Sequence, residues 1–241
     1  MHDWTAAWRH RGVQAALTIS SLMMMMAGCA TLPSVPSEAL GAEGWHAVHL
    51  PGKRPTVYRH EPKEGRSAVA ARAHSSASMW RRHASRAAES LGEVEFSWWV
   101  QALPANADVS QIDREDASAR VMFAFAGDVS RLSARNQMLF DLVQALSGEP
   151  PPFATLMYVW DAQAPVGSVI VNPRSDRIRK IVVESGVTGL RQWRSYRRNL
   201  VEDFRLAFGE APGALQAMAV MTDGDNTQSE VNTWYGDISL H

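Results

Sequence analysis

The sequence predicts a mainly β protein, an antiparallel β-sandwich of the jelly-roll type with two peripheral helices. Val94, Phe96, Trp98 and Val100 alternate with Glu95, Ser97 and Trp99, which is the two-residue period of a half-buried strand. Many similar short segments follow, and most are bounded by Gly, Pro, Asp or Asn. Because no helix separates each pair of strands, a doubly wound parallel sheet is disfavoured.

Strands are expected along the whole body of the chain. Residues 76–91 are ambiguous, because Met79, Trp80 and the Arg81-Arg82 pair fit a strand while Ala84–Leu91 fits a helical turn. The other expected strands are Trp45–Leu50, Val57–Arg59, Ala68–Ala73, Arg120–Phe125, Thr155–Trp160, Ile178–Val183, Leu215–Met221 and Trp234–Leu240.

Two amphipathic helices are expected between the strands. The first covers Ser130–Leu146 and is terminated by Gly148 and the three prolines after Glu149. The second covers Leu190–Phe208, where large apolar residues recur at spacings of three or four, and it ends at Gly209. Both are interpreted as helices packed on the edge of the sandwich.

Residues 1–28 have the features of a secretory signal peptide. Arg9 and Arg11 precede an apolar run from residue 12 to residue 27, which is too short to span a bilayer comfortably. The run ends in small residues directly before Cys29, which resembles the lipobox of bacterial lipoproteins. That resemblance implies cleavage before Cys29 and its acylation, and Ala30 after the cysteine favours the outer membrane, facing the periplasm.

The remainder divides into a tether and a body. Residues 29–43 are rich in Pro and Ser without an apolar period and predict an extended tether, and residues 44–241 are long enough for one sandwich domain. The whole chain has 24 Lys and Arg against 25 Asp and Glu, so neither nucleic acid nor an anionic lipid surface is an expected electrostatic partner. Membrane attachment is expected through the N-terminal lipid alone.

The body resembles a bacterial domain-of-unknown-function family, number 3047, over about residues 44–240. The similarity is carried by an ordered set of blocks: Gly44-Trp45, Phe96–Val100, Ala119–Val121, Leu156–Trp160, Asn172-Pro173, Ile181–Gly186, Glu202–Phe204, Met221–Thr227 and Tyr235–Ile238. The resemblance implies an exported β-sandwich, galactose-binding-like in architecture, and it implies no catalytic residues.

The segment Asp223-Gly224-Asp225-Asn226-Thr227 is a candidate metal site. Two carboxylates and an amide follow one strand closely, and calcium prefers oxygen ligands of this kind. Asp237 from the final strand is a candidate third ligand. A plain turn whose side chains bond their own backbone is the alternative, and Arg198 or Arg205 is a candidate cation for neutralising the acids.

Other residues indicate ligand binding. Trp99 points away from the core set and is followed by Gln101, a pairing that suits stacking on a sugar, and Asp116 and Arg120 lie at the entry to a strand. The sequence lacks the motifs of common nucleophiles, nucleotide-binding loops and zinc proteases. We expect an envelope module that binds a glycan or cell-wall component without catalysis. The alternatives are a polysaccharide hydrolase using Asp116, Asp223 and Asp225, and an accessory subunit that binds an envelope protein.

Overall fold

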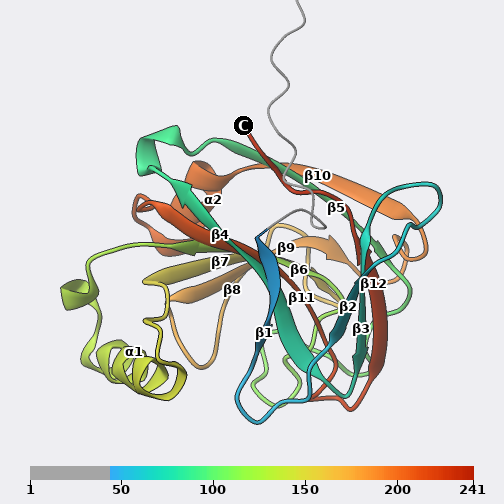
Figure 1. Ribbon diagram of the computed structural model, residues 1–241, viewed down its shortest axis with the longest axis horizontal. Helices are drawn as coiled ribbons and strands as arrows, with labels where there is room; N and C mark the ends of the chain where they lie inside the picture. Colours follow the sequence, from blue (N-terminus) through green and yellow to red (C-terminus); the bar gives the residue numbers. More distant parts are fainter. Residues whose placement is uncertain (1–43) are drawn as a thin grey trace, which may run out of the picture. The chain divides into compact units, whose positions relative to one another are not determined.

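The computed structural model describes residues 44–241, which form a β-sandwich of two sheets and two α-helices (Figure 1). The fold class expected from the sequence is confirmed. The expected signal peptide, the lipidated Cys29 and the tether fall on residues 1–43 and lie outside the described residues. Within the described part of the chain, no helix combines the length and apolar character needed to cross a membrane.

The first sheet has seven strands. In spatial order they are β1 (Trp45–His49), β4 (Ala77–Arg86), β11 (Leu215–Asp223), β6 (Arg120–Phe125), β7 (Ala154–Asp161), β9 (Ile178–Ser185) and β8 (Val169–Val171). All neighbours run antiparallel except β7 and β9, which are parallel. This pair departs from the purely antiparallel sandwich that was expected, because the chain between β7 and β9 turns back through β8 along the far edge of β9.

The second sheet packs against the first. Its spatial order is β10 (Trp193–Asn199), β5 (Glu93–Val100), β12 (Glu230–Tyr235), β3 (Val69–His74) and β2 (Val57–His60), with β13 (Ser239–Leu240) also pairing with β5. The single strand expected at Trp234–Leu240 is therefore two strands. Gly236 separates them, and a Cβ at this position would lie 2.3 Å from the Ser97 hydroxyl, so any larger residue would force that hydroxyl to rotate away.

The hydrophobic core lies between the sheets and is rich in aromatic rings. Phe96 of β5 stacks on Tyr158 of β7 at a centroid distance of 5.2 Å, and Trp98 meets Trp160 at 6.4 Å. These rings come from alternate positions of their strands, as the period of two predicts. The other positions of the same strands therefore face outward, and several of them, such as Trp99, Met157 and Val159, are also buried.

The second expected helix is wrong in its first half. Residues 193–199 form β10, paired along its length with β5, and only Leu200–Phe208 is helical (α2). The spacing of Trp193, Tyr196 and Leu200 imitates a helical period, but Tyr196 packs against Phe96 in the sandwich. The side chain of Asn199 caps α2 by accepting hydrogen bonds from the backbone amides of Val201 and Glu202, so the helix begins there.

The first helix, α1, spans Ala134–Ser147 and is capped by Ser133 and by Gly148 in the left-handed conformation. It lies at the periphery of the fold (Figure 1), where Asn136 near its N-terminus bonds to Asp176 in the β8–β9 loop. Its apolar residues Met138, Leu142 and Leu146 are 64%, 52% and 70% exposed. Of the residues that predicted this helix, Leu142 and Leu146 therefore lie outside the core, whereas Leu132, just before the helix, is buried.

Candidate functional site

The outward face of the seven-stranded sheet has a row of side chains set by strand register. Arg81 of β4 lies opposite Ala219 of β11, which lies opposite Met122 of β6, which in turn lies opposite Met157 of β7. The parallel neighbour of Met157 on β9 is Lys180. The row thus begins at a basic residue on β4, crosses Ala219, and continues over two methionines to a buried lysine on β9.

A groove of about 490 Å³ lies along this face. It forms because Ala124, Ala217 and Ala219 are too short to fill the space between β4 and the methionines, while the segment from Glu149 to Pro152 lines one side. The complete lining comprises Met79, Arg81, His83, Met122, Ala124, Glu149, Pro150, Pro152, Thr155, Met157, Ile178, Gln216, Ala217, Met218 and Ala219. Its volume falls in the range that small-ligand sites occupy.

Sequence reasoning did not find this groove. Its residues come from β4, β6, β7, β9, β11 and the segment after α1, and of these only Met157 lies in one of the family-like blocks. The one available signal was the outward position of apolar residues such as Met122 and Met157, on strands whose alternate residues are already core. Such a residue on a solvent face indicates a covered or binding surface, but register is needed to show that the two side chains meet.

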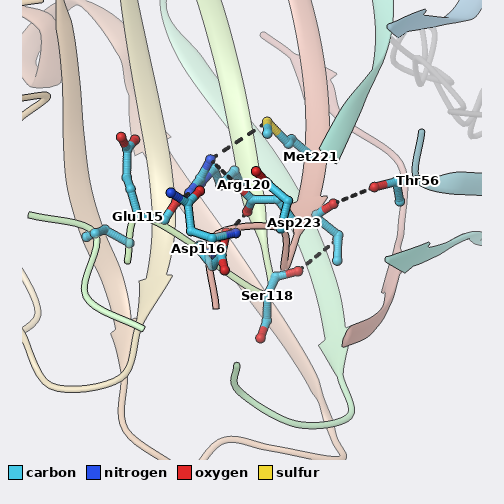
Figure 2. A network of polar contacts seen from close by, with 12 residues as sticks. Thr56, Glu115, Asp116, Ser118, Arg120, Met221 and Asp223 are labelled. Carbon is cyan, nitrogen blue, oxygen red and sulfur yellow. Dashed lines mark hydrogen bonds and ion pairs between the residues drawn. The ribbon is translucent and has the colours of Figure 1, made fainter. Parts of the chain in front are cut away.

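A buried ionic network lies on the same outer face, where Arg120 is two residues before Met122 on β6; Figure 2 shows the network. The Arg120 guanidinium of β6 lies 3.0 Å from the carboxylate of Asp223 at the end of β11, and Arg120 also donates to the backbone oxygen of Glu115 at 2.7 Å. Arg120 is 3% exposed and Asp223 2%. Asp223 further accepts a hydrogen bond from the Ala117 amide, so the pair joins two strands to the loop that precedes β6.

Asp116 holds the turn that follows β11. Its carboxylate accepts hydrogen bonds from the amides of Asn226 and Thr227 at 3.2 and 2.6 Å, and from the Thr227 hydroxyl at 2.6 Å. Asp116 is 1% exposed, so these three donors replace the water it would otherwise bind. The turn Asp223–Thr227 is therefore stabilised by Asp116, which lies more than 100 residues earlier in the sequence.

The predicted metal ligands are only partly brought together. One oxygen from each of Asp116, Asp223 and Asp225 lies within 4.8 Å of the others, whereas Asp237 is outside this group and exposed. The charges in the group already have partners, because Arg120 pairs with Asp223 and Lys53 pairs with Asp225. Calcium at these residues stays a prediction, and the ion would have to compete with both cations.

The prediction that Arg198 or Arg205 neutralises the acids of the Asp223–Thr227 turn was wrong. Arg198 does not reach it, because its guanidinium makes a two-pronged contact with Asp203 at 2.6 and 2.8 Å. Arg205 lies on α2 and is exposed. The partners are instead Arg120, for which the sequence suggested a local ion pair with Asp116 or ligand binding, and Lys53 from the β1–β2 connection, which no sequence pattern indicated.

A second buried pair lies beside the first. The Lys180 ammonium is fully buried, 2.7 Å from the carboxylate of Glu115, which also binds the Arg174 guanidinium and the Asn172 amide. Burial lowers the pKa of Lys180 to about 8, and the charge of Arg120 acts in the same direction, against the attraction of Glu115. This network anchors the loop before β6 over the outer face of the sheet.

Burial also raises the pKa of Asp223, to about 7, against the opposing attraction of Arg120. The carboxylates of Asp116 and Asp225 add to the rise. A carboxyl group that titrates near neutrality in this way is a feature of both functional sites and structural ion networks. The carboxylate of Asp223 contacts the Arg120 guanidinium and the Ala117 amide.

Trp99 lies on the outer face of the other sheet, under a hairpin formed by residues 61–68. The ammonium of Lys63 is 3.7 Å from the Trp99 ring centroid and 4.2 Å from that of Trp234. The indole N–H of Trp99 donates to Glu64, and that of Trp234 donates to Glu61. Trp99 is 6% exposed, so stacking on a sugar stays a prediction that requires this hairpin to move.

The four predicted ligand-binding residues do not form one site. Trp99 lies in β5 of the six-stranded sheet and the exposed Gln101 follows that strand, whereas Asp116 and Arg120 are buried on the outer face of the seven-stranded sheet. The loop from 101 to 119 connects the two pairs in sequence while crossing from one sheet to the other. The sandwich itself therefore separates the aromatic residue from the charged pair.

The family is decided by a match between a family model and residues 43–239, nearly the whole described body. The chain belongs to DUF3047, a family of proteins of unknown function. This confirms the resemblance found in the sequence. Among curated proteins, no match to this sequence is found.

The solved structures that match this chain include carbohydrate-binding modules. A family 11 module of a cellulosomal cellulase from Clostridium thermocellum shares 8% identity at a TM-score of 0.42, with 86% of this chain and 92% of that chain covered. A family 11 module from Clostridium thermocellum in complex with a β-1,3-1,4-mixed-linked tetrasaccharide shares 6% identity at a TM-score of 0.43. The match covers 86% of this chain and 93% of that chain. A xyloglucanase domain of a type three effector from Sinorhizobium fredii, in complex with cellobiose, shares 8% identity at a TM-score of 0.44. The match covers 86% of this chain and 97% of that chain.

The two buried titrating groups predict how stability depends on pH. Between pH about 4 and 7, Asp223 holds a proton in the folded protein that the unfolded chain releases, so the free energy of unfolding falls as pH rises. Between pH about 8 and 10.5, Lys180 is deprotonated in the fold but protonated in the unfolded chain, so stability rises with pH. Urea denaturation across pH 4–10 should therefore show a minimum near pH 7–8.

The substitution Asp223→Asn should flatten the acid limb of that curve, although it lowers stability overall by leaving Arg120 without its counter-charge. The control Asp141→Asn removes an exposed carboxyl on α1 and should leave the curve unchanged. An acid limb that keeps its slope in Asp223→Asn would contradict the assignment.

The cation partners of the acidic group predict its response to calcium. Replacing Lys53 by Met removes the ammonium that pairs with Asp225, so calcium should raise the melting temperature of Lys53→Met more than that of the parent protein. Thermal melts in calcium and in chelator measure this difference, with Arg59→Met as the exposed control on the other sheet. An unchanged midpoint in all three proteins would mean that the group is purely structural.

Proposed function

We propose that this protein is a lipid-anchored binding module of the cell envelope, which holds a glycan or another cell-wall component without chemical conversion. The observation that carries the proposal is the open groove on the outer face of the seven-stranded sheet. Ligand sites are typically concave and mostly apolar with a few polar groups. Arg81, His83 and Gln216 supply such groups on one side of this groove.

The carboxylates favour binding over hydrolysis. A glycoside-cleaving site needs two carboxyl groups that face each other across a sugar ring. Asp116 and Asp223 are almost fully buried, and each is engaged by protein donors or by Arg120. Asp225 is paired with Lys53. A polysaccharide could reach these acids only after the ion network had opened, so the hydrolase alternative gains no support from the geometry.

One observation favours the third alternative, an accessory subunit that binds an envelope protein. The apolar residues of α1, with Met138, Leu142 and Leu146 more than half exposed, form a stripe at helical spacing beside the sandwich. Stripes of this kind are used for docking onto a partner. The groove and the stripe are separate surfaces, so a protein partner at α1 is compatible with a ligand in the groove.

The anchoring part of the proposal has a direct test. The substitution Cys29→Ser removes the only thiol in the chain, and with it the expected acceptor of the lipid. The parent protein should incorporate a labelled fatty acid and fractionate with the outer membrane, whereas Cys29→Ser should remain unlabelled and unprocessed. Label that persists in the Cys29→Ser protein would show that the anchor is elsewhere.

The groove is tested by filling it. Ala124→Phe places a ring into the space between β6 and its neighbours, so binding of the mature chain to purified cell-wall sacculi or envelope polysaccharide should fall at least tenfold. The matched control Ala47→Phe adds the same ring at an exposed position of β1 and should bind normally. Sedimentation binding assays give the affinities, and melting temperatures show that both variants are folded. Equal binding by the two variants would move the ligand site away from the groove.

A further inference from the structure

The floor of the groove has the chemistry of a hydrocarbon site. Met79, Met122, Met157 and Ile178 provide its larger side chains, and alanines line the hollow between them. Sugar rings are commonly held by stacking on Trp or Tyr, but the described lining contains no Trp, Tyr or Phe. Methionine side chains are flexible and polarizable, and they adapt to irregular apolar ligands.

The β4 edge of the groove is basic. Arg81 and His83 are successive outward residues of β4, and the His83 ring stacks with His46 of β1 at 5.9 Å between centroids. The Nε of Arg81 is buried and lacks an acceptor among the described residues. Its guanidinium contacts Glu149 at 3.2 Å, but that carboxylate is 65% exposed and so holds the arginine weakly. The edge therefore retains capacity for an anionic acceptor.

The register joins these two features into one amphipathic site. Arg81 and Met122 both lie opposite Ala219, so the basic edge is separated from the methionines by the width of one strand that carries only small side chains. A ligand that places an anionic group at Arg81 would direct the rest of its length over Ala219 toward Met122 and Met157. The open volume of about 490 Å³ lies along this path.

We propose that the groove binds the hydrocarbon chain of an anionic amphiphile, with its carboxylate or phosphate head at Arg81 and His83. The proposal rests on the proposed function in taking the groove as the ligand site. It narrows the bound envelope component to one that carries an acyl or similar chain. Charge complementarity at the β4 edge selects the anionic head, and the methionine floor selects the chain.

Chain length is the first variable to test. The mature chain, residues 29–241 with Cys29→Ser, is titrated calorimetrically with octanoate, decanoate, laurate and myristate below their aggregation concentrations. Each added pair of methylenes should tighten binding by roughly fifteenfold until the groove is filled, since one buried methylene is worth roughly fourfold in affinity. Binding should also show a negative heat-capacity change. Affinity that is independent of chain length would overturn the proposal.

Two matched pairs of variants locate the ligand. Met122→Gln keeps the size of the floor residue but makes it polar, and should weaken laurate binding at least fivefold, while Met138→Gln on exposed α1 should not. Arg81→Gln should weaken laurate but leave the uncharged dodecanol unchanged, while Arg59→Gln on the other sheet should affect neither. If Met138→Gln is as damaging as Met122→Gln, the chain binds at α1 and the groove assignment fails.

The outcomes separate this proposal from the proposed function. Polysaccharide or sacculus binding that is lost in Ala124→Phe, combined with no binding of any fatty carboxylate, would overturn the amphiphile and leave the glycan module intact. Fatty carboxylate binding that is lost in Ala124→Phe, without polysaccharide binding, would support the amphiphile and overturn the glycan. Dodecyl phosphate replaces laurate in a second titration, and the tighter of the two identifies the head group.

Discussion

The contact between Arg120 and Asp223 is the constraint on which the arrangement of the site depends. Both groups are buried on the outer face of the seven-stranded sheet, and truncating either side chain removes the buried partner of the other, at a cost of about 3–5 kcal/mol. The same two side chains hold the loop before β6, through the oxygen of Glu115 and the amide of Ala117. That loop can therefore cross the sheet at only one place.

The covered and open parts of this face follow from that crossing. Val109 and Ala117 of the loop pack on Val159 and Val182, while Glu115 supplies the counter-charge for Lys180. The loop thus covers part of the outer face through these apolar contacts and through the buried ion pair between Glu115 and Lys180. The groove lies further along the same face, and its lining contains none of the three carboxylates of the acidic cluster.

On the outer face of the second sheet, the large aromatic rings are covered by the hairpin of residues 61–68. Trp99, Trp193 and Trp234 share one cluster with the hairpin above it, and each indole N–H donates to that hairpin. The hairpin turns at Glu64 and Gly65, both with positive φ, which suits a tight two-residue connection. Its tip positions Lys63 over two of the rings, so an aromatic group that sequence reasoning assigned to sugar is occupied by the protein's own cation.

Local pattern by itself determined the sandwich, most strand positions and the family, because alternation along a strand needs only neighbouring residues. It failed at Trp193–Asn199, where a helical spacing was overridden by pairing with β5, and it offered Asp237 and Arg198 for contacts made instead by Asp116 and Arg120. The groove was decided only by the tertiary structure. Its side chains meet through the register of five strands, and register depends on how the two inward faces pack, which no single segment specifies.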